Sequence, residues 1–299
     1  MTSSGKSTIS SLTGYVKKIS DVFAQRKNEN LLFRGHKNKS YSACPSALRN
    51  EGWIAHEHKM IRELLAEHPL EFSQDETIFE KLVRAQHYEL PTRLLDVTRN
   101  PLVALFFACE YPTDENGEVI IFEPDKDKTK FFDDDIISCI SNLSLLSEKQ
   151  KSDIRAFSLT CREAAREEFP DDRESFQHQL VTSFNEHEDV KRLVKMAQIE
   201  RPSLQAPLHP DDLSNIVAVI PRRLHKRLMA QDGAFLAHGL FTDPREYHFM
   251  DNLEVTEIYV AKNSKERIRT ELLQVGISKK TLFPEIDKSA NQIRQLFYK

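Results

Sequence analysis

The 299-residue chain is 39% hydrophobic and 29% charged, a composition typical of a globular protein and not of a disordered one. Its mean hydropathy of −0.51 is that of a polar but globular chain. Its net charge of −4 at pH 7 provides no overall field that attracts nucleic acid or an anionic membrane. Four cysteines without CxxC spacing and the lack of a run of 18 apolar residues predict a cytoplasmic protein with reduced thiols, no membrane contact and no metal site.

In chain order, a flexible polar tail is expected at residues 1–14, followed by an amphipathic helix over 15–28. The stretch "NENLLFRGH" predicts a brief strand that ends at Arg34. Residues 56–68 predict a helix whose apolar stripe also carries Glu57. A carboxylate on a core-facing stripe needs a cationic partner, although a place in the first turn, favoured by the helix dipole, explains it equally well.

The helix expected over residues 76–89 carries polar groups on its buried side. Gln86 lies seven residues after Phe79 on the apolar stripe, so its amide should point inward and needs hydrogen-bond partners. His87 lies at the edge of the stripe, where a single histidine is more often structural than catalytic. Pro91 ends this helix.

The stretch "TRLLDVT" that follows predicts a short strand. Its alternation places Thr92, Asp96 and Thr98 on one face and Arg93 on the other. The helix expected over residues 102–110 is apolar nearly all round and should be buried. Polar groups packed against such a helix form either a buried structural network or a functional site.

The remaining pattern predicts an α+β protein with a small mixed or antiparallel sheet core and surrounding helices. Residues 125–212 are highly charged with helical periodicity, which predicts a helical insertion in a single composite domain over residues 15–299. The other expected elements are strands near 117–123, 214–223, 233–238 and 255–261, a helix from Ser264 onwards, and a terminal helix after residue 280.

Three segments carry a resemblance: "LLFRGH" at 31–36, "AQHYELPTRLLDVTRNPLVALFFA" at 85–108, and "RLMAQDGAFLAH" at 227–238. Together they resemble the FRG domain family, named for its Phe-Arg-Gly motif, over most of residues 20–299. The chain departs from the family pattern at Glu89, where a glycine is usual, and at Val97, where a tryptophan is usual. Members occur in bacteria and their viruses, in contexts that suggest defence or toxicity.

The Phe-Arg-Gly strand is also remotely similar to the NAD-binding arginine motif of arginine-type ADP-ribosyltransferases. The resemblance implies a fold of that type and an NAD-consuming enzyme, either a transferase or a glycohydrolase. The order of Arg34, the strand Thr92–Thr98 and Gln231-Asp232-Gly233 is similar to the order of that family's motifs. With the chemistry of the neighbouring side chains, the expected catalytic residues are Arg34, His87, Asp96, Thr98 and Gln231, with Glu57 in support. The implied contacts to the NAD-like nucleotide are Phe33, Arg34, Gly35, His36, Gln86, Thr92, Arg93, Gly233 and Phe235.

The chemistry of these residue types suits cleavage of the nicotinamide–ribose bond. Arg34 is a bidentate donor for a phosphate, and Gly35 would let a ligand approach the backbone. Gln231 can form hydrogen bonds but cannot act as a base, so Asp96, Glu57 or Asp232 would have to supply a carboxylate. The expected acceptor is a protein or a nucleic acid, and the expected protein partner is a regulatory protein or an antitoxin.

Two other functions compete. The stretch "PRRLHKR" at 221–227 favours a nucleic-acid-binding module, which would present an open positive surface there. A catalytically silent interaction protein is the third hypothesis; it predicts that Glu57 or Asp96 seals Arg34 from solvent. Arg93 could likewise pair with Asp96 or with a helix carboxylate. An enzyme instead predicts that Arg34, Asp96, Thr98 and Gln231 meet in one cleft.

Overall fold

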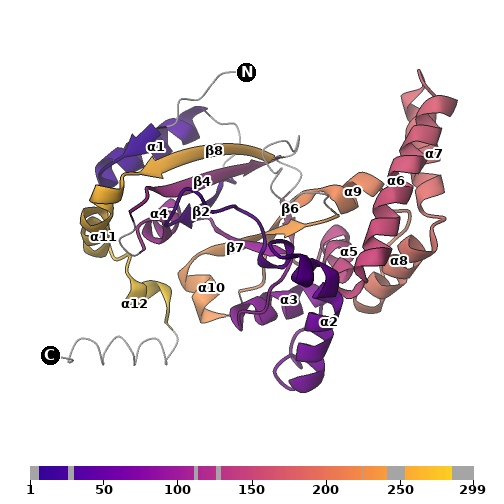
Figure 1. Ribbon diagram of the computed structural model, residues 1–299, viewed down its shortest axis with the longest axis horizontal. Coiled ribbons are helices and arrows are strands. Elements are labelled where there is room, and N and C mark those ends of the chain that lie inside the picture. The colour runs from indigo at the N-terminus through magenta and orange to yellow at the C-terminus, as the bar shows by residue number, and fades with distance from the viewer. Residues whose placement is uncertain are drawn as a thin grey trace.

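The computed structural model describes residues 7–25, 30–110, 114–125, 129–223, 225–240 and 253–284. One eight-stranded mixed sheet runs through it in the order β1-β8-β4-β2-β3-β7-β6-β5 (Figure 1). The predicted α+β class is confirmed, with a larger sheet than expected. The strands are β1 (Ser7–Ile9), β2 (Leu32–His36), β3 (Leu94–Thr98), β4 (Gly117–Pro124), β5 (Thr129–Phe131), β6 (Ile216–Ile220), β7 (Gly233–His238) and β8 (Leu253–Val260).

The sheet is weakly joined at its centre, between β2 and β3. Strand β2 pairs with β4 along its whole length, and β3 pairs with β7 in the same way. Between β2 and β3, however, the register contains a single pair, Phe33 opposite Thr98. Backbone groups that lose their ladder partners need others, so this split is where a cavity and unusual polar contacts are expected.

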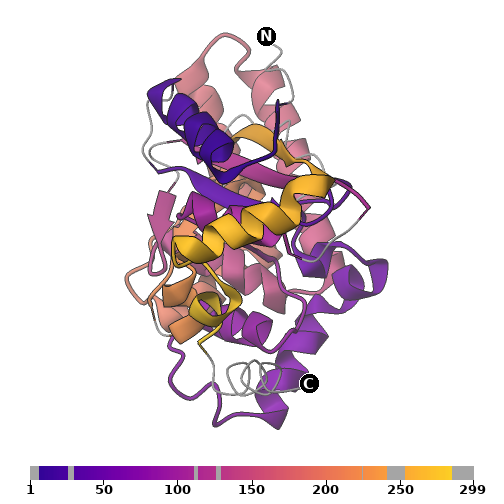
Figure 2. The ribbon, with the colours of Figure 1, turned by 90° about the vertical axis from the view of Figure 1, so that its left-hand side faces the viewer.

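The helices α1 (Leu12–Gln25), α4 (Pro101–Ala108) and α11 (Lys265–Gln274) share one apolar core over β2, β4 and β8. Figure 2 shows α1 and α11 at this end of the molecule. A Cβ atom on Gly35 would lie 1.8 Å from the Ala104 carbonyl oxygen. Position 35 is therefore glycine because the backbone of α4 packs directly against it. The close approach of a ligand is not needed to explain the glycine.

A helical layer covers the opposite end of the sheet (Figure 1). Its members pack around a separate apolar core that includes Leu143, Phe184 and Leu193. The helical structure predicted for this stretch is therefore confirmed, apart from β5, which pairs in parallel with β6 at the sheet edge. The helices are α5 (Asp135–Asn142), α6 (Glu148–Glu168), α7 (Arg173–Phe184), α8 (Glu188–Glu200) and α9 (Pro210–Ser214).

Two further helices, α2 (Glu51–Glu67) and α3 (Ile78–His87), pack beside the centre of the sheet. The Asn50 side chain caps α2, which therefore starts before the expected residue 56. A capping box between Thr77 and Glu80 starts α3. Short helices α10 (Lys226–Ala230) and α12 (Lys279–Leu282) complete the described chain.

The two ends of the chain differ from expectation. Residues 7–9 pair with β8 and α1 begins at Leu12, so the expected flexible tail at 1–14 is corrected for residues 7–14. Most of the expected terminal helix lies outside the described residues. Within the described ranges, no helix has both the length and the apolar character needed to cross a lipid bilayer.

Candidate active site

A cavity of about 210 Å³ opens where β2 and β3 separate. Four residues that the sequence singles out line it together: Arg34, Asp96, Thr98 and Gln231. The predicted convergence of these four in one cleft is therefore confirmed, while their chemical roles remain predictions. The other lining residues are Phe33, Gly35, Val97, Val103, Phe107 and Arg227.

Arg34 connects the two halves of the sheet. Its Nη1 atom donates a hydrogen bond to the Asp96 backbone oxygen at 2.6 Å, and its Nε atom donates to His36 Nε2 at 2.9 Å. A guanidinium can only donate, so His36 Nε2 must accept and the ring carries its proton on Nδ1, 3.6 Å from Glu118 Oε2. Burial, together with Arg34 and Arg49, lowers the pKa of His36 to about 3. His36 thus positions Arg34 as a neutral acceptor and does not line the cavity.

Asp96 is the carboxylate that faces the cavity. It lies in the middle of a central strand, yet it is exposed. Among the described residues, no donor forms a hydrogen bond or ion pair with its carboxylate. Two further cavities, of about 70 and 250 Å³, also have Asp96 in their walls. The Asp96 side chain therefore borders three cavities.

The loop before β7 holds Gln231 and Asp232 in a fixed arrangement. The Thr98 hydroxyl donates to the Gln231 carbonyl at 2.6 Å, and Gln231 Nε2 donates to the Leu282 carbonyl at 3.0 Å. The Asp232 carboxylate accepts from Arg99 and Arg223. Because the Gln231 amide and the Asp232 carboxylate are both occupied, neither matches the free carboxylate that the chemistry requires.

His87 lines the neighbouring cavity of about 70 Å³, together with Gln86, Asp96 and Phe235. Its ring stacks on His225, with centroids 5.8 Å apart and planes 3° apart. Burial lowers the pKa of His225, so the His225 ring stays neutral more readily. Gln86 Oε1 accepts a hydrogen bond from the buried Thr92 hydroxyl, which confirms that Gln86 has a polar partner.

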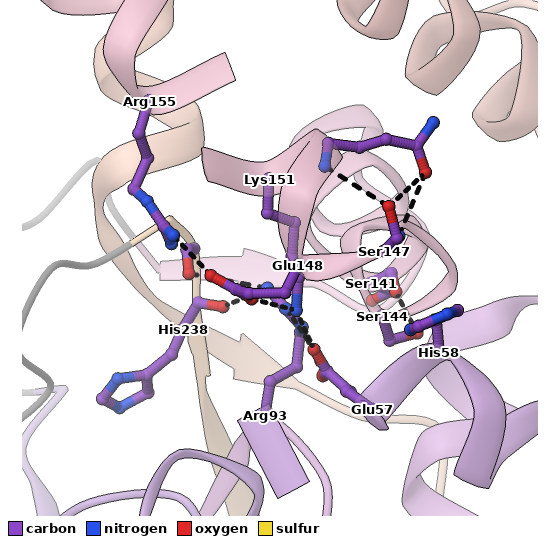
Figure 3. Close-up of polar contacts among 12 residues, drawn as sticks. Glu57, His58, Arg93, Ser141, Ser144, Ser147, Glu148, Lys151, Arg155 and His238 are labelled. Atoms are coloured by element: carbon purple, nitrogen blue, oxygen red, sulfur yellow. Dashed lines mark hydrogen bonds and ion pairs between the residues drawn. The ribbon is translucent and has the colours of Figure 1, made fainter. Parts of the chain in front are cut away.

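Arg93 and Glu57 lie away from the cleft, in a buried ion network (Figure 3). Arg93 donates to both Glu57 carboxylate oxygens, at 2.9 and 2.6 Å, and to the His238 carbonyl at 3.1 Å. Lys151 of α6 donates to the same carboxylate at 2.9 Å. The predicted cationic partner of Glu57 is confirmed. The alternatives that paired Arg34 with Glu57 or Arg93 with Asp96 are wrong, and Arg93 is not in contact with the cleft.

Arg93, Thr92 and Gly233 have structural roles and do not line the cleft. Thr92 is buried and accepts a hydrogen bond from the Leu94 backbone N–H. Gly233 begins β7, where a Cβ atom would meet Leu228 Cδ1 at 2.5 Å. The structure therefore gives each of these three predicted ligand contacts a packing or hydrogen-bonding explanation instead.

The basic stretch at 221–227 does not present a continuous positive surface in its described residues. Arg222 pairs with Glu76 and Glu80, and Arg223 pairs with Asp232. Arg227 lies in the cleft wall with its guanidinium 4.9 Å from the Phe283 ring centroid. These contacts use cationic groups that a nucleic-acid interface would need.

Sequence reasoning missed four residues of the cleft wall: Val97, Val103, Phe107 and Arg227. Arg227 precedes Gln231 by four residues, so helical spacing could have placed both on one face. Phe107 lies in an apolar run with no signal that separates it from its buried neighbours. Within the described residues, no group of three or more His, Cys, Asp or Glu side chains is arranged to hold a metal ion.

Comparison with known families gives one match. Residues 29–117 match the model of the FRG domain. The chain carries an FRG domain. No curated protein and no solved structure matches the chain. The FRG domain contains Arg34, His87, Asp96 and Thr98, whereas Gln231 and Arg227 reach the cleft from outside it. The match is therefore narrower than the resemblance over residues 20–299 implies.

Proposed function

We propose that this protein consumes NAD, as an ADP-ribosyltransferase or an NAD glycohydrolase, in the cleft between β2 and β3. One observation carries the proposal: the free Asp96 carboxylate and the half-buried Arg34 guanidinium line the same cavity at the split in the sheet. The remote similarity to arginine-type ADP-ribosyltransferases supports it. The ADP-ribosyltransferase-like fold is part of the same proposal.

The proposed reaction breaks the bond between ribose C1′ and the nicotinamide nitrogen. The bonding electron pair leaves with nicotinamide, which becomes neutral, and positive charge develops on the ribose. Asp96 would stabilise this charge, because a carboxylate fixed beside a developing positive charge lowers its energy. Water or an acceptor hydroxyl then attacks C1′ and releases a proton, which His87 or solvent accepts.

The other residues of the cleft wall suit the phosphate groups and the planar ring of NAD. Arg227 and the Nη2 atom of Arg34 can donate to phosphate oxygens, because guanidinium N–H groups form strong charge-assisted hydrogen bonds with them. Phe33, Val103 and Phe107 supply apolar surface on which a planar ring packs. Among the three carboxylates considered, Glu57 and Asp232 are held by cations, which leaves Asp96.

The test is release of free nicotinamide from NAD by the purified protein, with and without RNA, DNA and cell lysate. Asp96→Asn keeps the shape of the side chain and should lower the rate by at least about 100-fold, the scale on which one electrostatic group acts. Asp153→Asn, on the exposed side of α6, is the matched control. No nicotinamide release under any condition, with no NAD-dependent thermal shift, would overturn the proposal.

A role as a toxin or phage-defence effector extends this proposal, and it rests on the contexts of the FRG family. Loss of cellular NAD stops growth, so the wild-type chain should slow growth when it is expressed. The Asp96→Asn variant should not. If wild type and Asp96→Asn are equally toxic, the toxic effect does not depend on the Asp96 carboxylate in the cleft.

A further inference from the structure

Next to the cleft lies a polar cavity of about 250 Å³, which we call the arginine chamber. Arg34 and Asp96 line both spaces, so a ligand at these two residues borders both. The remaining walls of the chamber are Ser46, Arg49, Gln86, Glu89, Leu90, Leu94 and Leu95.

The chamber contains cationic donors that the described part of the chain does not use. Arg49 Nε donates to the Cys44 carbonyl at 2.8 Å, whereas its two Nη atoms have no acceptor there. Arg34 likewise keeps Nη2 available. Neither guanidinium forms an ion pair among the described residues. Two neighbouring cations repel each other, and a bound anion would remove that repulsion.

Ser46 adds a neutral donor. Its Oγ atom accepts a hydrogen bond from the Thr92 backbone N–H at 3.2 Å, which leaves the hydroxyl proton free to point into the chamber. The acids of the chamber are Asp96 and the exposed Glu89. The chamber therefore contains both positive and negative side chains. A complementary ligand has an anionic group that binds the arginines and hydroxyl groups that donate to the carboxylates.

We infer that the arginine chamber binds the phosphate of a phosphorylated ribose, with Arg49 as the residue that sets its affinity. The ribose hydroxyls then face Asp96, and the base on the same ribose enters the apolar cavity at Phe33 and Phe107. This inference rests on the proposed function only for the identity of that base. Arg49 lies outside the residues that the sequence motifs singled out.

The experiment uses the full chain and measures binding of ribose 5-phosphate and of ribose by calorimetry. Arg49→Ala should weaken ribose 5-phosphate binding about 10- to 100-fold, as expected for lost charge-assisted hydrogen bonds, and Arg49→Lys should restore part of it. Arg62→Ala is the matched control, because Arg62 is also exposed and donates to a backbone carbonyl, of His58. Thermal melting confirms that each variant is folded.

Nicotinamide release is measured on the same proteins. If NAD is cleaved but Arg49→Ala changes neither KM nor ribose 5-phosphate binding, the inference is wrong and the proposed function stands. If ribose 5-phosphate binds in an Arg49-dependent way but no nicotinamide is released, the chamber is confirmed and the proposed function fails. Binding of ribose as tight as that of ribose 5-phosphate, or binding of neither, also overturns the inference.

Discussion

Replacing Glu57 with glutamine removes the one carboxylate shared by two buried cations. Arg93 and Lys151 are each 2% exposed, so water cannot solvate either charge. After the change, Arg93 keeps the His238 carbonyl and Lys151 keeps Glu148 at 3.1 Å. Breaking a buried ion pair from one side typically costs about 3–5 kcal/mol, because it leaves an uncompensated charge.

The pKa of Glu57 gives a second route to this magnitude. Burial alone would raise that pKa, but Arg93 and Lys151 outweigh it and lower the value from 4.5 to about 2. At about 1.4 kcal/mol per pH unit, the difference corresponds to roughly 3 kcal/mol of stability at neutral pH. Because the pKa is lower in the folded chain, this stabilisation is complete above about pH 4.5 and is lost as the pH falls toward 2.

Thermal and urea unfolding at pH 7 measure the effect. Glu57→Gln should lower Tm by roughly 6–20 °C, given a loss of about 3–5 kcal/mol and about 2–4 °C per kcal/mol. Glu63→Gln, on the exposed side of the same helix, should stay within about 0.5 kcal/mol of wild type. The difference between wild type and Glu57→Gln should shrink between pH 4.5 and 2. A loss below 1 kcal/mol at pH 7 would refute the reasoning.

Three further outcomes are expected. Gly35→Ala should cost roughly 3 kcal/mol or more, because its Cβ would lie 1.8 Å from the Ala104 oxygen; melting curves should show no such loss for Gly14→Ala in α1. Glu89→Gly should raise Tm by about 2 °C, since Glu89 has φ of 66° and a non-glycine residue there costs about 1 kcal/mol; an unchanged or lower Tm would contradict this. Burial raises the pKa of Cys109 to about 12, so a thiol reagent at pH 8 should modify it only after unfolding, and rapid labelling of the native protein would count against the packing.

The elements that sequence predicted correctly are those with a repeating apolar pattern. The stripe through Phe79 and Gln86 located α3, and the continuous apolar run located α4, because helical periodicity is a local signal. Strands β1 and β5 were missed, since each has three residues and too little pattern. Their pairing with β8 and β6 depends on chain segments far away in sequence.

The site was predictable only in part, for a related reason. Residue type and motif identified Arg34, Asp96 and Gln231, and the structure brings them to one cavity. Which charges pair with each other was not predictable. The sequence indicates that Glu57 needs a cationic partner. That this partner is Arg93 and not Arg34 follows from how α2 packs beside the start of β3.

Strand β3 shows why polar groups gather in this part of the chain. It shares one paired position with β2, so the ladder does not fix it on that side. On that side the Arg34 guanidinium bonds the Asp96 carbonyl in the middle of the strand and replaces a hydrogen bond that a continuous sheet would supply. Side-chain bonds to other elements hold the ends of the strand: Arg93 to Glu57 before it begins, and Thr98 to the Gln231 carbonyl at its end.

Arg34 has two roles, and a single substitution removes both. Its Nη1 atom bonds the Asp96 carbonyl across the split in the sheet, and its guanidinium also lines the cavity. Arg34→Ala would therefore lose binding and also release β3, so inactivity of that variant would not distinguish a catalytic role from a structural one. The Asp96 carboxylate holds nothing in the described chain, and Asp96→Asn keeps the backbone carbonyl that Arg34 needs. Asp96 is for that reason the position at which loss of activity with unchanged stability identifies the chemistry of the cleft.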